Sequence, residues 1–276
     1  MNKEIYWEKA LSQSETAIKK GNLFPLKTFD ITNEIYKKDD FIIRKLDLCN
    51  FKKNMTFGPK INPFNPWEKN LEIEKIGINH QLILNKYPVQ IGHILLITNN
   101  WKPQNGWLDK KDWIAVKIVN NDTSGLWFFN SGPLAGASQP HRHLQLLRRS
   151  SHEKICPRED WFLEKCEKGN DNKLFYKNLI VKKFKFSNSV DDIYKIYLDI
   201  AKEIGLGNPL VNKTPLYPYN LLITNEWIAI IKRSIDYKFG FNVNALGFAG
   251  YILTTDESNI DYLKSEGPES LLKKFV

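Results

Sequence analysis

The segment Asn130-Ser131-Gly132-Pro133-Leu134-Ala135-Gly136-Ala137-Ser138-Gln139-Pro140-His141-Arg142-His143-Leu144-Gln145 is the most informative stretch of this chain. An apolar run, Leu126-Trp127-Phe128-Phe129-Asn130, leads into it as a strand. Gly132 and Gly136 permit sharp turns and close backbone approach. The small residues around these glycines leave amide N–H groups uncovered, as a nest for phosphate oxygens requires. We therefore expect an anion-binding loop between two strands.

The end of this segment has the alternation of an extended strand. Side chains two residues apart share one face of a strand, so His141, His143 and Gln145 project together toward the phosphate side. Leu144 and Leu146 point to the other face and into a core, which fixes the register. The pattern predicts two imidazoles and an amide beside the anion-binding loop.

This arrangement suits transfer of a nucleotide through a histidine. A neutral imidazole is nucleophilic at pH 7 and can attack an α-phosphorus to form a phosphoramidate, whose P–N bond is labile once the nitrogen is protonated. Loop amides and Gln145 would stabilise charge on the non-bridging oxygens. Gln145 donates hydrogen bonds but supplies no proton. A polyphosphate leaving group needs little such help, because its terminal pKa is about 6.

The histidine pair has two other interpretations besides catalysis. A His-x-His pair is often a structural pair whose nitrogens are satisfied by the fold. Histidines at i and i+2 on a strand can also chelate zinc, but further ligands are not obvious: His152 is close in sequence, and Cys156 and Cys166 lack standard spacing. The glycine-rich approach, the alternation and Gln145 together favour catalysis over both.

Composition sets broad limits on the class of protein. Of 276 residues, 42% are hydrophobic and 26% charged, as in an ordinary globular protein. The net charge of +9 suits a protein that handles anions, although solvated surface lysines explain it equally well. Three cysteines without a close pair, Cys49, Cys156 and Cys166, support neither a disulfide framework nor a four-Cys zinc site. With no apolar stretch long enough for a signal peptide or membrane span, we expect a cytoplasmic protein.

Hydrophobic periodicity predicts short strands among fewer helices. Strands are expected at 81–85, 94–98, 126–130, 143–147, 220–224, 227–232 and 250–254, and helices at 1–20, 110–121 and 190–204. The short connection Lys86-Tyr87-Pro88 indicates antiparallel pairing of the first two strands. The irregular alternation favours an α+β fold, a mainly antiparallel sheet flanked by helices. We expect residues 1–170 to carry the His-Arg-His-Leu-Gln strand and residues 171–276 to complete the nucleotide site within one compact unit.

The run Gly-Ala-Ser-Gln-Pro-His-Arg-His-Leu-Gln at 136–145 resembles the histidine-triad superfamily, in its His-x-His-x-Gln transferase branch. With Asn-Ser-Gly at 130–132, it is similar to the ATP adenylyltransferases, or diadenosine tetraphosphate (Ap4A) phosphorylases. Residues 85–88 and 92–98 resemble that family's core strand pair. Asn-Ala-Leu-Gly-Phe-Ala-Gly at 244–250 resembles its C-terminal nucleotide-contacting segment. The resemblance extends from about residue 60 to 255, and the fold it implies is histidine-triad-like.

The resemblance also implies an activity, phosphorolysis of Ap4A by phosphate to ATP and ADP through an adenylylated histidine. It implies His143 as the nucleophile, with His141 and Gln145 as the other catalytic residues. The partners would be Ap4A, ATP, ADP and phosphate, with no nucleic acid or membrane, and a divalent cation such as Mg²⁺ would accompany the polyphosphate. No protein ligand of a metal is assigned, and the oligomeric state is left open. The implied substrate-binding residues are Lys60, Asn85, Lys86, Asn130, Gly136, Ala137, Ser138, Gln139, Gln145, Asn244, Ala245, Leu246 and Tyr251.

One departure from the family bears on specificity, and two other functions were considered. Tyr251 stands where the family commonly has Met, and Thr254-Thr255 where a Lys is usual, which would remove a charge partner for a distal phosphate. Tyr251 would stack near a base or pack in the core beside Phe248. Uridylyl transfer between hexose phosphates is disfavoured, because that branch usually has Pro where this chain has Arg142. RNA binding draws on the charge and the 13% aromatic content, but no RNA-recognition motif is visible.

Overall fold

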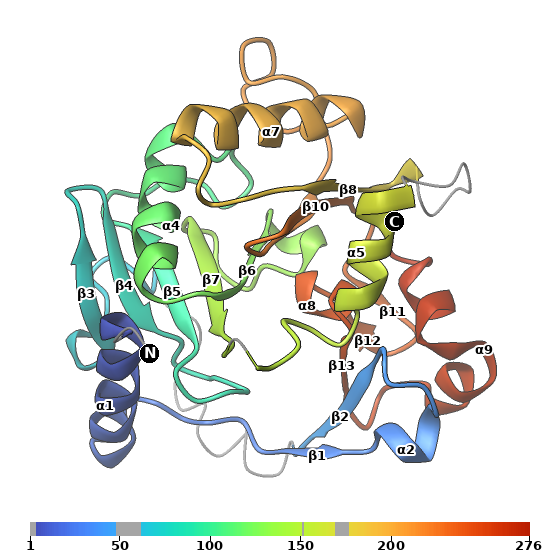
Figure 1. Ribbon diagram of the computed structural model, residues 1–276. Coiled ribbons are helices and arrows are strands. Elements are labelled where there is room, and N and C mark those ends of the chain that lie inside the picture. Colours follow the sequence, from blue (N-terminus) through green and yellow to red (C-terminus); the bar gives the residue numbers. More distant parts are fainter. Residues whose placement is uncertain (1–3, 48–61, 151, 169–176) are drawn as a thin grey trace.

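The computed structural model describes residues 4–47, 62–150, 152–168 and 177–276 (Figure 1). Eight strands form one antiparallel sheet in the order β3-β4-β5-β7-β6-β9-β10-β8. They are β3 (Glu72–Ile76), β4 (His80–Leu84), β5 (Ile94–Thr98), β6 (Gly125–Asn130), β7 (His143–Arg148), β8 (Leu179–Lys183), β9 (Tyr219–Ile223) and β10 (Trp227–Lys232). β6 and β7 are the two central strands. The segment that joins them, residues 131–142, therefore lies at the ends of the strands, in the middle of the sheet.

Two smaller sheets and several helices complete the fold. In the smaller sheets, β2 (Ile42–Leu46) pairs with β1 (Thr28–Asp30) and in parallel with β13 (Tyr251–Thr254), and β11 (Tyr237–Lys238) pairs with β12 (Phe241–Asn242). The helices are α1 (Ile5–Lys19), α2 (Thr32–Ile35), α4 (Lys110–Asp122), α5 (Glu159–Lys168), α7 (Val190–Glu203), α8 (Ala245–Phe248) and α9 (Ile260–Leu272), with 3₁₀ turns η1 (Lys69–Leu71) and η2 (Pro133–Ala135). Among the described residues, no helix is long and apolar enough to cross a membrane.

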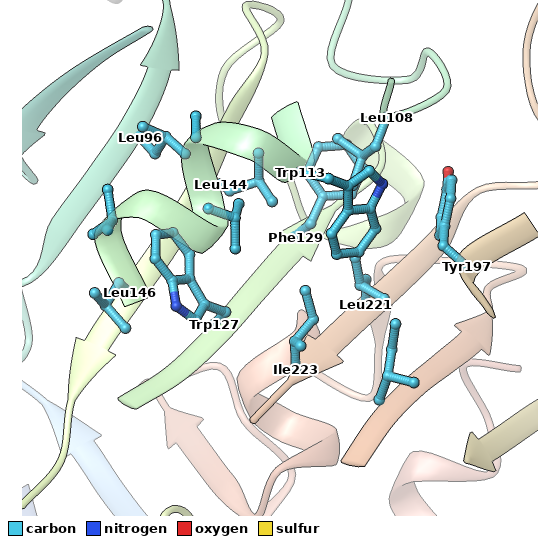
Figure 2. Packing of buried hydrophobic residues seen from close by; sticks show 14 of the residues in the cluster. Leu96, Leu108, Trp113, Trp127, Phe129, Leu144, Leu146, Tyr197, Leu221 and Ile223 are labelled. Atoms are coloured by element: carbon cyan, nitrogen blue, oxygen red, sulfur yellow. The ribbon is translucent and has the colours of Figure 1, made fainter. Parts of the chain in front are cut away.

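One face of the large sheet carries the main hydrophobic core, beneath α1, α4 and α7 (Figure 1). Leu144 and Leu146 of β7 are buried there in one cluster with Trp113 of α4 and Tyr197 of α7 (Figure 2). This packing confirms the predicted register of 143–147. Because side chains alternate along a strand, His143 and the other odd-numbered residues of β7 lie on the opposite face.

The opposite face is covered by two separate apolar clusters. On the β6 side, Phe128 and Leu147 pack in a cluster that also contains side chains of α5, α8, α9 and the β1-β2-β13 sheet. On the β5 side, Ile97 packs with Phe64 in a smaller cluster. Ile97 is paired with His143 across the β5–β7 ladder. The polar end of β7 therefore lies between the two clusters.

The α+β fold class with a large antiparallel sheet is confirmed. The strands expected at 94–98 and 227–232 have these same bounds in β5 and β10, and the other predicted elements differ by a few residues at their ends. The described elements that were not predicted include β3, β8 and α5 at the large sheet, and β1, β2, α2, α8, α9, β11 and β12 outside it. The run Glu-Ile-Glu-Lys-Ile of β3 is largely half-exposed and is charged at Glu72, Glu74 and Lys75, so it lacks the apolar signal of the central strands.

Candidate active site

His143 is placed and oriented by the backbone just before it. The ring is 4% exposed, and its Nδ1 lies 2.8 Å from the carbonyl oxygen of His141. Because a carbonyl can only accept, Nδ1 carries the proton and the lone pair of the neutral ring lies on Nε2. Burial lowers the pKa of His143 to about 4, so the ring is neutral at pH 7. Among the described residues, no group forms a hydrogen bond with His143 Nε2. The lone pair of this nitrogen is therefore not engaged by any described group.

His141 is engaged by the protein at both ring nitrogens. Its Nε2 lies 2.8 Å from the carbonyl oxygen and 3.0 Å from the hydroxyl of Thr98. Its Nδ1 lies 2.9 Å from the side-chain amide of Asn62. A ring held on both sides has no free lone pair with which to attack phosphorus. The His141 carbonyl orients the ring of His143, and of the two histidines only His143 has a ring nitrogen without a described partner.

The backbone of His143 is held by Gln104, which the sequence analysis did not identify. Thr98 N–H donates to the Arg142 carbonyl, so by alternation the N–H and C=O of His143 point away from β5 and toward β6. There the buried Gln104 side chain accepts from His143 N–H at 2.8 Å. Its Nε2 donates to the Asn130 carbonyl at 2.8 Å and the His143 carbonyl at 3.1 Å. One side-chain amide thus ties the end of β6 to the start of β7.

Asn130 joins the two halves of the chain at this edge of the sheet. Its Oδ1 accepts from Asn220 Nδ2 at 2.8 Å and from the Ala245 amide at 2.9 Å. Asn244 caps the start of α8, its Oδ1 accepting from the Leu246 amide at 2.9 Å. The predicted residues Asn130, Asn244 and Ala245 are therefore brought together, although more than 100 residues separate the first from the others.

The glycine loop packs against the same segment. Gly136 has a φ of +83°, and a Cβ atom there would lie 2.7 Å from the Cβ of Asn244, so the close approach requires glycine. The expectation of uncovered amides is wrong for three positions. The N–H groups of Ala135 and Ala137 donate to the Gly132 carbonyl, and that of Gly136 to the Pro133 carbonyl. These donors form hydrogen bonds within the loop because residues 133–135 adopt a 3₁₀ turn.

The loop amides that could still meet a phosphate follow this turn. Within the described part of the chain, the amides of Ser138 and Gln139 donate to no other group. Both residues lie between the 3₁₀ turn and the strand that carries His143. The expected anion-binding role of the loop is therefore restricted to these two N–H groups.

Gln145 lies next to His93 on the same face of the sheet. Burial is the largest influence on His93 and lowers its pKa to about 4, while a side-chain interaction with Gln145 opposes that effect. Asn85 Nδ2 lies 3.2 Å from His93 Nδ1, and Asn85 Oδ1 accepts from the Tyr87 amide at 3.0 Å. In the part of the chain that is described, His93 Nε2 has no partner of full hydrogen-bond geometry. Asn85, which is predicted to contact substrate, contacts His93 and the following turn.

Of three other predicted residues, Lys86 and Tyr251 have contacts of their own and Lys60 lies outside the described ranges. Lys86 Nζ lies 5.7 Å from the ring centre of Phe24 and 5.8 Å from that of Tyr87. The hydroxyl of Tyr251 accepts from Arg149 at 3.0 Å, so a cation lies beside the position where the family commonly has Met. Lys60 falls among residues 48–61, outside the described residues.

Arg142, between the two histidines, points to the opposite face. Its guanidinium donates to Asp112 at 3.0 Å, and Asp112 lies 2.8 Å from His80 Nε2. Burial would raise the pKa of Asp112, but the His80 hydrogen bond and the charge of Arg142 outweigh it and hold that pKa below its ordinary value. This buried network anchors the strand to α4 and takes no part in the site. The ranges that are described contain no group of three His, Cys, Asp or Glu side chains able to hold a metal ion.

Comparison with known proteins gives the family. Residues 1–159 match the family described as the Ap4A phosphorylase N-terminal domain, and residues 172–276 match that of the ATP adenylyltransferase C-terminal domain. The chain belongs to this family. The prediction made from the His-Arg-His-Leu-Gln segment is therefore confirmed, and with it membership in a family of nucleotidyltransferases.

Two relatives come from Saccharomyces cerevisiae. Diadenosine 5',5'''-P1,P4-tetraphosphate phosphorylase 2 is 28% identical over 245 residues, which cover 78% of this chain and 75% of the relative. Protein APA1 is 29% identical over 213 residues, 69% of this chain and 65% of the relative, so that match spans slightly less than two thirds of APA1.

The fold of this chain is similar to that of a solved yeast protein. The crystal structure of yeast Ap4A phosphorylase Apa2 in complex with AMP has a TM-score of 0.72 at 23% identity, covering 99% of this chain and 96% of that one. The complex of Apa2 with Ap4A gives a TM-score of 0.71 at 22% identity, with the same coverage.

Proposed function

We propose that this protein is an ATP adenylyltransferase that cleaves Ap4A with inorganic phosphate to give ATP and ADP. The observation that carries the proposal is the state of His143: a buried, neutral imidazole whose Nδ1 proton is held by the His141 carbonyl at 2.8 Å. Membership in the Ap4A phosphorylase family supplies the substrate class. The relatives named above support it, since one is named for the phosphorylase activity and another is described in complexes with AMP and Ap4A.

In the first step, the Nε2 lone pair of His143 attacks the α-phosphorus of one adenosine. The P–N bond forms as the bond to the bridging oxygen breaks, and ATP leaves as the anion. Nδ1 keeps its proton, and the His141 carbonyl stabilises the positive charge that the ring acquires. The described donors nearest to the transferring group are the amides of Ser138 and Gln139 and the side chains of Asn130 and Gln145. They would stabilise the non-bridging oxygens.

In the second step, an oxygen of inorganic phosphate attacks the same phosphorus and the P–N bond breaks. The electron pair returns to His143 Nε2, and ADP is released. No general acid is required in either step, because both leaving groups are stable as they depart: a polyphosphate anion and a neutral imidazole. This explains how Gln145, which donates hydrogen bonds without supplying a proton, suffices at a position where an acid would otherwise serve.

Two further features belong to the proposal. A divalent cation such as Mg²⁺ would arrive with the polyphosphate as part of the substrate. Because the described ranges contain no three-residue cluster able to hold a metal, we assign no ligand in this chain to it. We also propose a cytoplasmic location, since Cys156 and Cys166 are free thiols, as suits a reducing compartment.

The test is a single-turnover reaction of purified protein with Ap4A in the absence of phosphate, followed by addition of phosphate. Wild type should first accumulate an acid-labile, base-stable adenylyl-protein together with one equivalent of ATP, and then release ADP. The His143→Ala variant should form no adduct, whereas His141→Asn should form it slowly. Adduct formation from UDP-glucose but not from Ap4A would instead indicate uridylyl transfer. Absence of any adduct with wild type would overturn the proposal.

A further inference from the structure

A buried arginine lies behind the glycine loop, where neither the motif nor the proposed mechanism uses it. Arg233 is 1% exposed. It donates to the Phe275 carbonyl at 3.1 Å, the Ile235 carbonyl at 2.6 Å, the Ala135 carbonyl at 3.4 Å and the side-chain oxygen of Asn220. These four acceptors are uncharged. Burial lowers the pKa of Arg233 only to about 9, so the guanidinium is charged at pH 7.

The guanidinium determines which way two asparagine amides face. An arginine side chain can only donate hydrogen bonds, so Asn220 must present its Oδ1 to Arg233. The Nδ2 of Asn220 then faces the other way, where it donates to the Asn130 side-chain oxygen at 2.8 Å and to the Ala135 carbonyl at 2.7 Å. Asn130 accepts on Oδ1 a second time, from the Ala245 amide at 2.9 Å. With its oxygen used twice, Asn130 must turn its Nδ2 away from this cluster.

The direction in which Asn130 turns follows from the sheet. Phe128 pairs with Gln145 across the β6–β7 ladder, and continuing this register places Asn130 opposite His143. Asn130 is two residues beyond Phe128 and therefore shares its face, which is also the face of His143 and Gln145. Among the residues that the structure describes, no acceptor is bonded to Asn130 Nδ2. Its N–H groups are thus available beside the nucleophile.

We propose that Arg233, acting through Asn220, holds the Asn130 amide with its N–H toward a non-bridging oxygen of the transferring phosphate. Arg233 and Asn220 are then positioning residues for the reaction, and Asn130 is the group that touches substrate. The chain of hydrogen bonds runs in one direction from a fixed positive charge, so each bond polarises the next. This inference rests on the proposed function and extends it to residues remote from the His-Arg-His-Leu-Gln segment.

The most specific perturbation is Asn220→Asp, because the two side chains have nearly the same size and shape. The carboxylate still accepts from Arg233, as an ion pair, so folding is retained. It cannot donate, so the Asn130 oxygen keeps only the Ala245 amide as a donor and faces a carboxylate oxygen. This repulsion favours the rotated Asn130 amide, which donates to Asp at position 220 and presents its oxygen to the phosphate. We expect adenylyl-enzyme formation from Ap4A to slow by about 10²-fold or more, the effect of losing one preorganised donor. The matched control is Asn120→Asp, which alters a buried asparagine that bonds Trp127 and Asn225 away from the site.

Three further measurements separate positioning from a structural role. Placed on an Asn130→Ala background, Asn220→Asp should slow the reaction no further, because the group through which it acts is already missing. In ADP–phosphate exchange, wild type should prefer one diastereomer of ADP with sulfur at the α-phosphorus. Asn220→Asp should reduce that preference, since one oxygen has lost its donor. Arg233→Lys, which keeps the charge and a donor, should retain more activity than Arg233→Met.

The outcomes distinguish failure of this inference from failure of the proposed function. If wild type forms no adenylyl-enzyme, the proposed function fails and takes the inference with it. If wild type is active, three results would overturn the inference alone. These are an Asn220→Asp rate within threefold of the Asn120→Asp rate, additive losses in the double variant, or an unchanged diastereomer preference at matched thermal stability.

Discussion

Replacing Gln104 by Met tests whether the placement of the His143 backbone governs the rate. The substitution keeps an unbranched side chain of similar length but removes three hydrogen bonds, one from His143 N–H and two to the carbonyls of His143 and Asn130. The Asn130 carbonyl loses only one of its two hydrogen bonds, because it still accepts from Gly132 N–H at 3.0 Å. The His143 N–H is left buried without an acceptor, which costs about 1–3 kcal/mol. We expect the free energy of unfolding to fall by about 2–4 kcal/mol in total.

The catalytic effect should exceed what this destabilisation alone explains. Without the Gln104 amide, β6 and β7 are no longer joined at the end that carries the nucleophile, and His143 can shift relative to the glycine loop. A displacement of about 1 Å from the attack geometry costs on the order of 10²-fold in rate. We therefore expect single-turnover adenylylation by Gln104→Met to slow about 100-fold at saturating Ap4A, with a smaller change in the Ap4A concentration required for half saturation.

The assay is rapid-quench adenylylation combined with urea denaturation of the same preparations. Asn120→Leu serves as the control, because it also removes two buried side-chain hydrogen bonds, to Asn225 and Trp127, away from the site. If Gln104→Met loses stability as the control does but adenylylates within threefold of wild type, Gln104 is only structural. The reasoning from backbone placement would then be refuted.

Three further outcomes follow from the geometry. Ap4A has no phosphate that titrates near neutrality, so the single-turnover rate should stay level on acidification and fall only as pH drops through about 4, where His143 becomes protonated; a midpoint near 6.5 in the rate profile would contradict the assignment. Gly136→Ala forces a Cβ into Asn244 at a φ of +83°, and we expect a loss of about 1–3 kcal/mol in stability with weaker Ap4A binding, measured by thermal denaturation and calorimetry. Arg142→Met leaves the buried Asp112 without its guanidinium partner and should cost about 3–5 kcal/mol of stability. Because Arg142 faces away from the site, the rate per folded molecule should change little, and a large loss of that rate would show that the network reaches the nucleophile.

Local sequence was sufficient for the catalytic strand and for the family. The period of two in residues 141–147 places histidines and leucines on opposite faces whatever surrounds them. Positive-φ conformations select glycine at positions 132 and 136 by backbone sterics alone. Such signals lie within a few residues of chain, which is why the strand, the loop and the likeness to ATP adenylyltransferases could all be predicted.

Tertiary structure alone decided which histidine is free and what holds it. Thr98 and Asn62 occupy the nitrogens of His141, yet neither differs in sequence pattern from many other polar residues of the chain. The amides of residues 135–137 are likewise hydrogen-bonded within a 3₁₀ turn, and the composition of the loop does not reveal that turn.

The supports of the site come from distant parts of the chain. Gln104 reaches a strand 39 residues further on, and Arg233 reaches a loop 98 residues earlier. A single buried glutamine or arginine has no periodicity, and its role depends on which backbone groups the completed sheet leaves without partners. The sequence by itself therefore determined the strand of His143, the register of that strand and the family of the chain, whereas only the folded sheet decided the groups that orient His143.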